Sequence, residues 1–284
     1  MINKDGFDEE WLYRKKFAMN TRAKQSIIFE RSNNHTEFGK QYQKYQNMWS
    51  LFGNDNNKLL VLSNIAIKEE SGILRDIYEF INKFNFNIES MFNKRLSIDI
   101  LTKDNLLFDK FQKIIREFDP CLSGIKIDKN IDIDGHRTYR VSGVHKNIDN
   151  GEKILLPINY ESDGTIKIFN IMPMILKNLA VGGVLCIDEL DVKLHPLLFK
   201  KIVNMYNDRD MNRNNAQLIF TAHSTFMFNS NDFRRDELYL VDKDDSGKSK
   251  LYSLAEFKNL RVDADYEKKY LTGQFGAIPF DDQR

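Results

Sequence analysis

The segment Gly182–Pro196 reads GGVLCIDELDVKLHP, and it decides the fold class. Its apolar run VLCI has the length and composition of a buried strand. A helical stretch, HPLLFKKIVNMYN, follows it, and then a second apolar run, AQLIFTAH. Apolar strands joined by a helix predict a parallel pair that is buried on both faces.

The first strand of this pair runs directly into two carboxylates, Asp188 and Glu189, and the second strand ends at His223. Ligands of open α/β sheets bind beyond the carboxyl ends of parallel strands. One acid there can hold Mg²⁺ through water, a second can orient or deprotonate water, and a histidine can contact a phosphoryl group. We therefore expect the three side chains to lie together as equipment for hydrolysing a nucleotide phosphate.

Each of these residues also has an ordinary structural interpretation. An Asp-Glu pair after a strand is often a solvated turn or a helix N-cap, and a single histidine after a strand is usually structural. These alternatives stay open when each residue is considered alone.

The composition is that of a globular protein: 284 residues, of which 42% are hydrophobic and 29% charged. The net charge of +1 gives no overall attraction to nucleic acid or membranes. The two cysteines, Cys121 and Cys186, form no CxxC pair, so a reducing cytoplasm is the expected compartment, with Cys186 as a small buried residue. The first residues contain no apolar signal-peptide core.

The first part of the chain combines a strand with helices. The stretch SIIFERS (Ser26–Ser32) predicts a strand, and apolar residues recur at helical spacing over 73–84 and 107–118. Asp119-Pro120 is expected to stop the second of these helices. The run KLLVLSNIAI (58–67) fits a helix or a strand equally well.

The later part alternates apolar and polar residues, which predicts antiparallel strands in GIKIDKNIDIDG and TYRVSGVH. KILLPINY reads as another strand, and DELYLVDKDDSGKSKLYSL as a hairpin. Between them, ESDGTIKIFNIMPMILKNLA predicts a turn and a helix that Pro173 should kink or restart.

Four motifs in this order resemble those of ABC-type ATPases. VLCIDELDVKLHP resembles their Walker B and D-loop segment, QLIFTAHS their H-loop and ESDGTIK (Glu161–Lys167) their signature motif. The Leu-His-Pro ending is similar to prokaryotic AAA-labelled ATPases related to the OLD and SMC proteins. The ending of the chain and the early EEWLY…IFER extend the resemblance over nearly the whole chain, most strongly over residues 161–280.

This resemblance implies an α/β fold, an ABC-ATPase-like lobe of the P-loop NTPase class with parallel core strands and flanking helices. A mainly helical insert and some antiparallel strands accompany it. Residues 1–45 would be a remnant of the N-terminal ATPase lobe, 46–122 the helical insert, and 123–284 the C-terminal ATPase lobe with its signature, Walker B and H-loop motifs.

The resemblance also assigns catalytic roles for ATP hydrolysis with Mg²⁺. Asp188 would hold Mg²⁺ through water, Glu189 would polarise the hydrolytic water and His223 would sense the γ-phosphate. His195 stands where many ABC proteins have the D-loop aspartate, which is usual for the Leu-His-Pro branch but leaves the contact between subunits undefined.

The signature motif would bind ATP through Ser162, Gly164 and Thr165 at the start of a helix, where backbone N–H groups and the helix dipole favour an anion. Because the signature of one subunit meets the nucleotide of another, self-association is implied. An ordinary helix cap explains the same residues without a nucleotide.

The sequence contains no P-loop of the form G-x-x-x-x-G-K-[ST]. DSGKS (Asp245–Ser249) has Asp242 in place of the first glycine and lies in the predicted hairpin turn, while the Phe38–Lys40 stretch FGK is followed by glutamine. The chain therefore resembles the part of an ATPase that follows its P-loop lobe. Met1 would then be an internal start, a split-gene start or a truncation.

Three functions fit these observations. The first is an ATPase lobe that needs a P-loop-bearing segment or partner chain, in phage defence by resemblance. The second is a non-enzymatic remnant or regulatory dimerisation module. The third, an OLD-type nuclease, is disfavoured because only 61 residues follow His223 and they match the ATPase ending. No nucleic-acid motif is evident, and Lys177 and Asn178 interrupt the most apolar stretch, which excludes a membrane span there.

Overall fold

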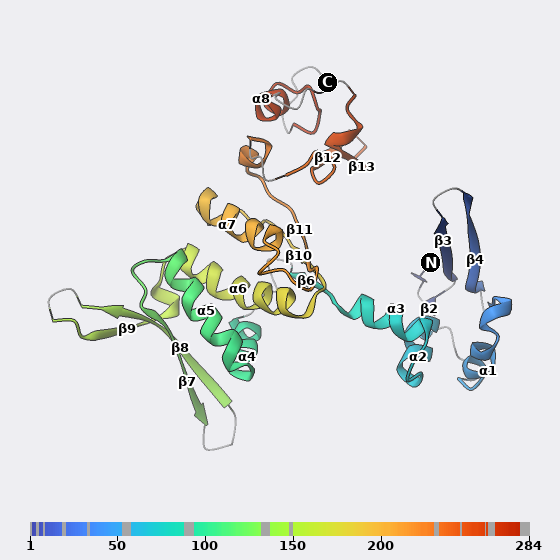
Figure 1. The fold of residues 1–284 in the computed structure, drawn as a ribbon, viewed down its shortest axis with the longest axis horizontal. Coiled ribbons are helices and arrows are strands. Elements are labelled where there is room, and N and C mark those ends of the chain that lie inside the picture. The colour runs from blue at the N-terminus through green and yellow to red at the C-terminus, as the bar shows by residue number, and fades with distance from the viewer. Residues whose placement is uncertain are drawn as a thin grey trace. The chain divides into compact units, whose positions relative to one another are not determined.

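The computed structural model describes residues 2–3, 6–7, 9–18, 21–32, 35–52, 58–87, 94–131, 137–147, 150–229, 233–244, 246–258, 260 and 265–278. The chain divides into two compact units, Met1–Phe84 and Asn85–Arg284, and each is described by itself. Figure 1 follows their helices and strands along the chain from blue to red. The boundary at Phe84 falls inside the segment predicted as one helical insert, and the three-part division stays a prediction.

The first unit contains a three-stranded antiparallel sheet in the order β3-β4-β5. Its strands are β3 (Glu9–Ala18), β4 (Thr21–Ser32) and β5 (His35–Phe38), and a short separate pair is β1 (Ile2–Asn3) with β2 (Gly6–Phe7). Strand β4 includes Ser26–Ser32, which confirms the strand predicted there.

Short helices complete the first unit: η1 (Lys40–Tyr42), α1 (Lys44–Ser50), α2 (Val61–Lys68) and α3 (Ile73–Asn82). Helix α2 resolves the ambiguous run KLLVLSNIAI, and α3 confirms the helix predicted over 73–84, although it ends at Asn82. Sheet and helices share a core around Phe29, Tyr45 and Ile65, which are at most 1% exposed.

The second unit is mixed α/β. Its helices are α4 (Lys94–Lys103), α5 (Asn105–Phe118), η4 (Ile158–Tyr160), α6 (Asp163–Val181), α7 (Pro196–Asn207), η5 (Thr225–Asn229), η6 (Leu254–Glu256) and α8 (Tyr266–Leu271). Its strands are β6 (Phe84–Asn87, which begins at the unit boundary), β7 (Gly124–Ile131), β8 (Arg137–Lys146), β9 (Lys153–Pro157), β10 (Val184–Ile187), β11 (Gln217–Phe220), β12 (Tyr239–Lys243) and β13 (Ser249–Ser253).

Helix α6 is the centre of this unit's core and packs against α4, α5 and β10. Phe169 on α6 meets Phe111 on α5 edge to face, with ring centroids 6.0 Å apart, and neither is exposed. Helix α5 ends at Phe118, as the Asp119-Pro120 stop predicted. Figure 1 shows α6 lying alongside α5.

The predicted restart of α6 at Pro173 does not occur, because the helix runs unbroken from Asp163 to Val181. Proline removes one backbone hydrogen bond from a helix interior. Here Met172, Pro173 and Ile175 are all buried, so packing on both sides of the proline holds the helix together.

Strands β10 and β11 are parallel, with Val184 opposite Gln217 and Ile187 opposite Phe220, which confirms the predicted pair. They belong to a three-stranded sheet in the order β11-β10-β6. The prediction that both strands are buried on both faces is wrong for β11, where Ile219 is 56% exposed. Exposed and half-buried residues alternate along β11, so the side chains of one face, Ile219 among them, are left uncovered.

Two antiparallel sheets complete the second unit, in the orders β7-β8-β9 and β12-β13. They confirm the antiparallel strands predicted from alternation, of which residues 132–135 lie outside the described part, and the predicted hairpin. The described residues of DSGKS lie in the β12–β13 turn. There, Asp244 Oδ1 accepts hydrogen bonds from the backbone N–H groups of Ser246 and Lys248 at 2.9 Å each. A strand follows this turn, so it is no phosphate-binding loop.

Within the described residues, no helix combines the length and the hydropathy that crossing a bilayer requires.

Replacing Phe169 with alanine tests the central role of α6. We expect Phe169→Ala to lower the free energy of unfolding by about 3–5 kcal/mol in urea denaturation, because a fully buried ring leaves a cavity. Leu106→Ala is the control, since Leu106 is 68% exposed on the neighbouring helix and should change stability by no more than about 0.5 kcal/mol. Equal losses in both variants would contradict this account of the core.

Candidate functional site

Thr221 holds the Asp188 carboxylate and the Glu189 backbone at the carboxyl end of the parallel pair. Its backbone N–H extends the strand ladder by donating to the Ile187 carbonyl oxygen at 3.1 Å. Its hydroxyl donates to Asp188 Oδ1 and accepts the backbone N–H of Glu189 at 2.8 Å. Sequence analysis did not identify this threonine, although it lies only two residues before His223, at the end of the same predicted strand.

Glu189 and His223 form a direct contact, with Glu189 Oε1 3.1 Å from His223 Nε2. The structure therefore brings Asp188, Glu189 and His223 to one edge of the sheet, as the sequence predicts. The hydrogen bond from the carboxylate raises the pKa of His223 above its ordinary value. The His223 side chain is 73% exposed and that of Glu189 33%, so this pair faces solvent at the mouth of the site.

Asp191 positions the segment that follows β11. Its Oδ2 accepts the backbone N–H groups of His223 at 3.0 Å and of Ser224 at 2.8 Å. The acid after Leu190 is thus a positioning residue for His223, and sequence analysis did not identify it. Its side chain acts on backbone groups more than thirty residues away, and no local spacing reveals such a contact.

Lys167 anchors the loop that carries the acids. Glu189 and Lys193 have left-handed φ values of 49° and 62°, which are uncommon for residues other than glycine. The Lys167 ammonium, from the second turn of α6, donates to the carbonyl oxygens of Glu189 and Val192 at 2.6 Å each. These charge-assisted bonds hold the loop in its unusual backbone conformation.

The start of α6 is a well-formed helix cap. Ser162 Oγ accepts the backbone N–H of Thr165 at 3.1 Å, and Thr165 Oγ1 donates to Asp119 Oδ2 at 2.6 Å. Thr165 is only 4% exposed, so its side chain serves the structure here. A Cβ on Gly164 would lie 3.2 Å from the Lys193 carbonyl oxygen, so glycine allows the acid loop to approach closely. Contact of Ser162, Gly164 or Thr165 with a nucleotide stays a prediction.

His195, at the position of the D-loop aspartate, caps α7. Its Nδ1 accepts the backbone N–H of Leu197 at 3.3 Å, and Pro196 occupies the first helical position, where its missing N–H costs no hydrogen bond. The Leu-His-Pro sequence therefore has a local structural explanation.

The donor set fits Mg²⁺ only in part. Asp188 offers an exposed carboxylate at the strand end, and hard oxygen ligands suit this ion. Among the described residues, no group of three or more histidine, cysteine or acidic side chains is arranged to hold a metal. A single carboxylate is nevertheless what nucleotide sites use, because substrate phosphates and water supply the remaining ligands.

A sequence profile described as "AAA domain, putative AbiEii toxin, Type IV TA system" matches residues 6–229. The chain belongs to this family of P-loop NTPases. The matched range contains the acids, the histidine and the start of α6. Family membership implies a P-loop NTPase fold and nucleotide binding, but it assigns no role to an individual residue. No curated protein matches the chain.

The His223 contact predicts a measurable titration. In NMR spectra of the ring protons we expect His223 to titrate above the ordinary value of about 6.5, and we expect its pKa to fall in Glu189→Gln. Because the folded pKa is raised, the stability from this contact is present below about pH 6.5 and is lost as the pH rises through the folded pKa. An unchanged His223 titration in Glu189→Gln would contradict the contact.

The Lys167 anchor predicts a loss of stability. Lys167→Met should lower the free energy of unfolding by about 2–4 kcal/mol, because two carbonyl oxygens lose charge-assisted hydrogen bonds. It should also speed amide hydrogen exchange over 189–193. Lys201→Met is the control, since its exposed ion pair with Glu117 should contribute no more than about 1 kcal/mol. Exchange over 189–193 that matches the wild type would contradict the anchoring role.

Proposed function

We propose that this chain is the part of an ABC-type ATPase that supplies the catalytic acid, and that it hydrolyses ATP when a P-loop-bearing segment completes the site. The contact between Glu189 and His223 at the carboxyl ends of β10 and β11 carries this proposal. It places a carboxylate beside an imidazole at the edge of the sheet where α/β proteins bind ligands.

In this proposal, three residues of the chain have separate roles in ATP hydrolysis. Glu189 orients a water molecule and takes a proton from it while the water oxygen forms a bond to the γ-phosphorus. The bond between the γ-phosphorus and the oxygen that bridges it to the β-phosphate breaks, which releases ADP. His223, when protonated, stabilises the negative charge on the γ-phosphoryl oxygens. Asp188, held by Thr221, would bind Mg²⁺ through water, and this ion neutralises phosphate charge when bound.

The outer edge of β11 is the proposed place for the missing P-loop strand. Strand β11 lies at the edge of the described sheet. A further parallel strand beside it would bring its own carboxyl end, where a P-loop begins, next to Glu189 and His223. That strand could come from the same longer polypeptide or from a separate chain.

Self-association is the second part of the proposal. The N-terminus of α6 carries Ser162 and Gly164, and helix N-termini attract phosphate through their N–H groups and dipole. We propose that this end meets the nucleotide held by a second subunit. A role in phage defence is proposed from the resemblance and from the toxin–antitoxin wording of the family description.

A regulatory or remnant module is the alternative, and two observations favour it. The side chains of Ser162 and Thr165 already satisfy a local helix cap, and the sequence contains no P-loop. Such a module would keep the dimerisation surface and hydrolyse nothing.

ATP titration and phosphate release test the proposal. We expect the isolated chain to bind ATP weakly and to release no phosphate, because P-loop N–H groups and a lysine provide much of the hold on the β- and γ-phosphates. Adding a P-loop-bearing polypeptide encoded beside this chain should restore Mg²⁺-dependent turnover. Glu189→Gln should then abolish turnover and spare binding, whereas the exposed Glu117→Gln should leave both unchanged.

Two results would contradict the proposal. Steady hydrolysis by the isolated chain, lost in Glu189→Gln, would show that the phosphate site lies within this chain. A completed complex that binds ATP but turns over equally with and without Glu189→Gln would remove the acid from catalysis and favour the regulatory alternative.

A further inference from the structure

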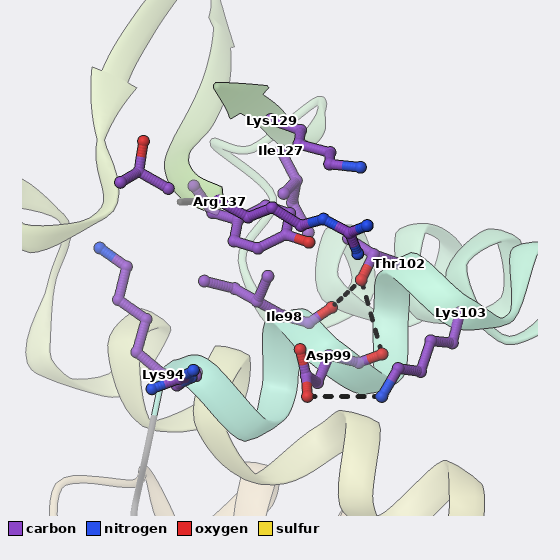
Figure 2. Close-up of a pocket in the computed structure, with 11 residues that line it drawn as sticks. Lys94, Ile98, Asp99, Thr102, Lys103, Ile127, Lys129 and Arg137 are labelled. Carbon is purple, nitrogen blue, oxygen red and sulfur yellow. Dashed lines mark hydrogen bonds and ion pairs between the residues drawn. The ribbon is translucent and has the colours of Figure 1, made fainter. Parts of the chain in front are cut away.

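A pocket of about 930 Å³ lies between α4 and the β7–β8 hairpin, away from the residues of the candidate site. Five basic side chains and one acidic side chain line it: Lys94, Arg95, Lys103, Lys129, Arg137 and Asp99. Figure 2 shows Lys94 and Lys103 entering from the helix, with Lys129 and Arg137 entering from the hairpin. We call this feature the basic groove.

The periodicity of each element explains how its lining residues reach the groove. Residues four apart are neighbours on a helix surface, so two adjacent rows of α4 line the groove: Lys94, Ile98 and Thr102 in one, and Arg95, Asp99 and Lys103 in the other. In the hairpin, Lys129 pairs with Tyr139, and Arg137 is two residues from Tyr139 on the same strand face. Both walls of the groove are therefore basic.

Among the described residues that line the groove, basic side chains outnumber acidic ones five to one. Asp99 pairs with Lys103 at 3.5 Å, and both side chains lie on the helix wall. Lys94 is partly buried, and its Nζ donates to Asn159 Oδ1 at 3.3 Å. Burial lowers the pKa of Lys94, so a bound anion would favour its charged form.

The shape of the groove favours a polymer over a small phosphate compound. Four of its five cations, all except Lys94, are exposed, so the charges surround an open groove rather than a closed cavity. Lys94 and Lys103 are nine residues apart, which is about 13.5 Å along the helix axis at ~1.5 Å per residue. A single strand laid along this length presents more than one phosphate to the cations.

The floor of the groove is suited to bases. Ile98 is buried there, and Ile127 and Tyr139 are half-buried. Aromatic and apolar side chains between cations are typical of proteins that bind single strands, whose unpaired bases are free to stack. A volume of about 930 Å³ holds a few nucleotides but is too small to take in a duplex.

We propose that the basic groove binds single-stranded nucleic acid through its phosphates, with one or more bases on the Ile127–Tyr139 floor. The groove lies wholly in the second unit and uses none of the residues assigned to ATP hydrolysis. This proposal therefore stands or fails independently of the ATPase proposal.

Fluorescence anisotropy with a labelled 15-nucleotide oligo-dT tests the proposal on the full chain. We expect binding that weakens with salt. Replacing Lys129 and Arg137 together with glutamine should weaken it roughly 10- to 30-fold at 0.1 M salt and reduce the salt slope by about 1.4, since each phosphate contact to a single strand contributes about 0.7. Both residues are exposed, and thermal melting verifies that the variant is folded.

The hairpin provides a matched control in Lys126→Gln with Arg140→Gln. These residues lie on the same two strands, and strand alternation points them to the opposite face. This variant removes the same charge and should bind like the wild type. Tyr139→Ala should weaken binding without changing the salt slope, because it removes a base contact and no cation.

Four outcomes would overturn the proposal. They are no binding by the wild type, equal weakening in the groove and control variants, tighter binding of a duplex of the same length, and full displacement of the oligonucleotide by inorganic pyrophosphate at matched charge concentration. The last outcome would identify a site for small phosphate compounds.

Discussion

The ammonium group of Lys167 joins the buried helix α6 to the loop that carries the acids. It binds the backbone carbonyl oxygens of Glu189, which is itself left-handed, and of Val192, which directly precedes the left-handed Lys193. Left-handed backbone costs free energy for residues with a Cβ, so the loop needs a fixed partner. Because α6 is held by α4, α5 and β10, the position of Glu189 depends on the core of the second unit.

The sequence predicted the parallel pair and the grouping of Asp188, Glu189 and His223 because both follow from local patterns. Apolar runs of strand length and the rule that carboxyl ends meet at one sheet edge are sufficient for that inference. The supporting contacts of Thr221, Asp191 and Lys167 could not be predicted in the same way. Each acts on a backbone group of a distant segment, in a geometry that only the folded loop creates.

Other features depended on neighbours that a sequence pattern does not specify. An apolar run indicates a strand, but it does not say whether both faces of that strand are covered, and the face of β11 that carries Ile219 is exposed. Pro173 leaves α6 unbroken because packing outweighs one lost hydrogen bond. The cations of the basic groove are spread from Lys94 to Arg137, so no local cluster in the sequence indicated a charged surface.

The contact between Glu189 and His223 is well suited to a site that must be completed by another segment. The histidine is largely exposed, and exposed ion pairs contribute little free energy, so an arriving phosphate could displace this contact at low cost. The contacts beneath it differ, because Asp191 and Lys167 bind backbone groups, and Thr221 binds the backbone N–H of Glu189 as well as the Asp188 carboxylate. Under the proposed function, the chain thus holds Glu189 and His223 in place before the phosphate arrives, while their side chains stay free to exchange partners. Much of phosphoryl-transfer catalysis comes from positioning the phosphate. In the proposed site, a P-loop would provide that positioning.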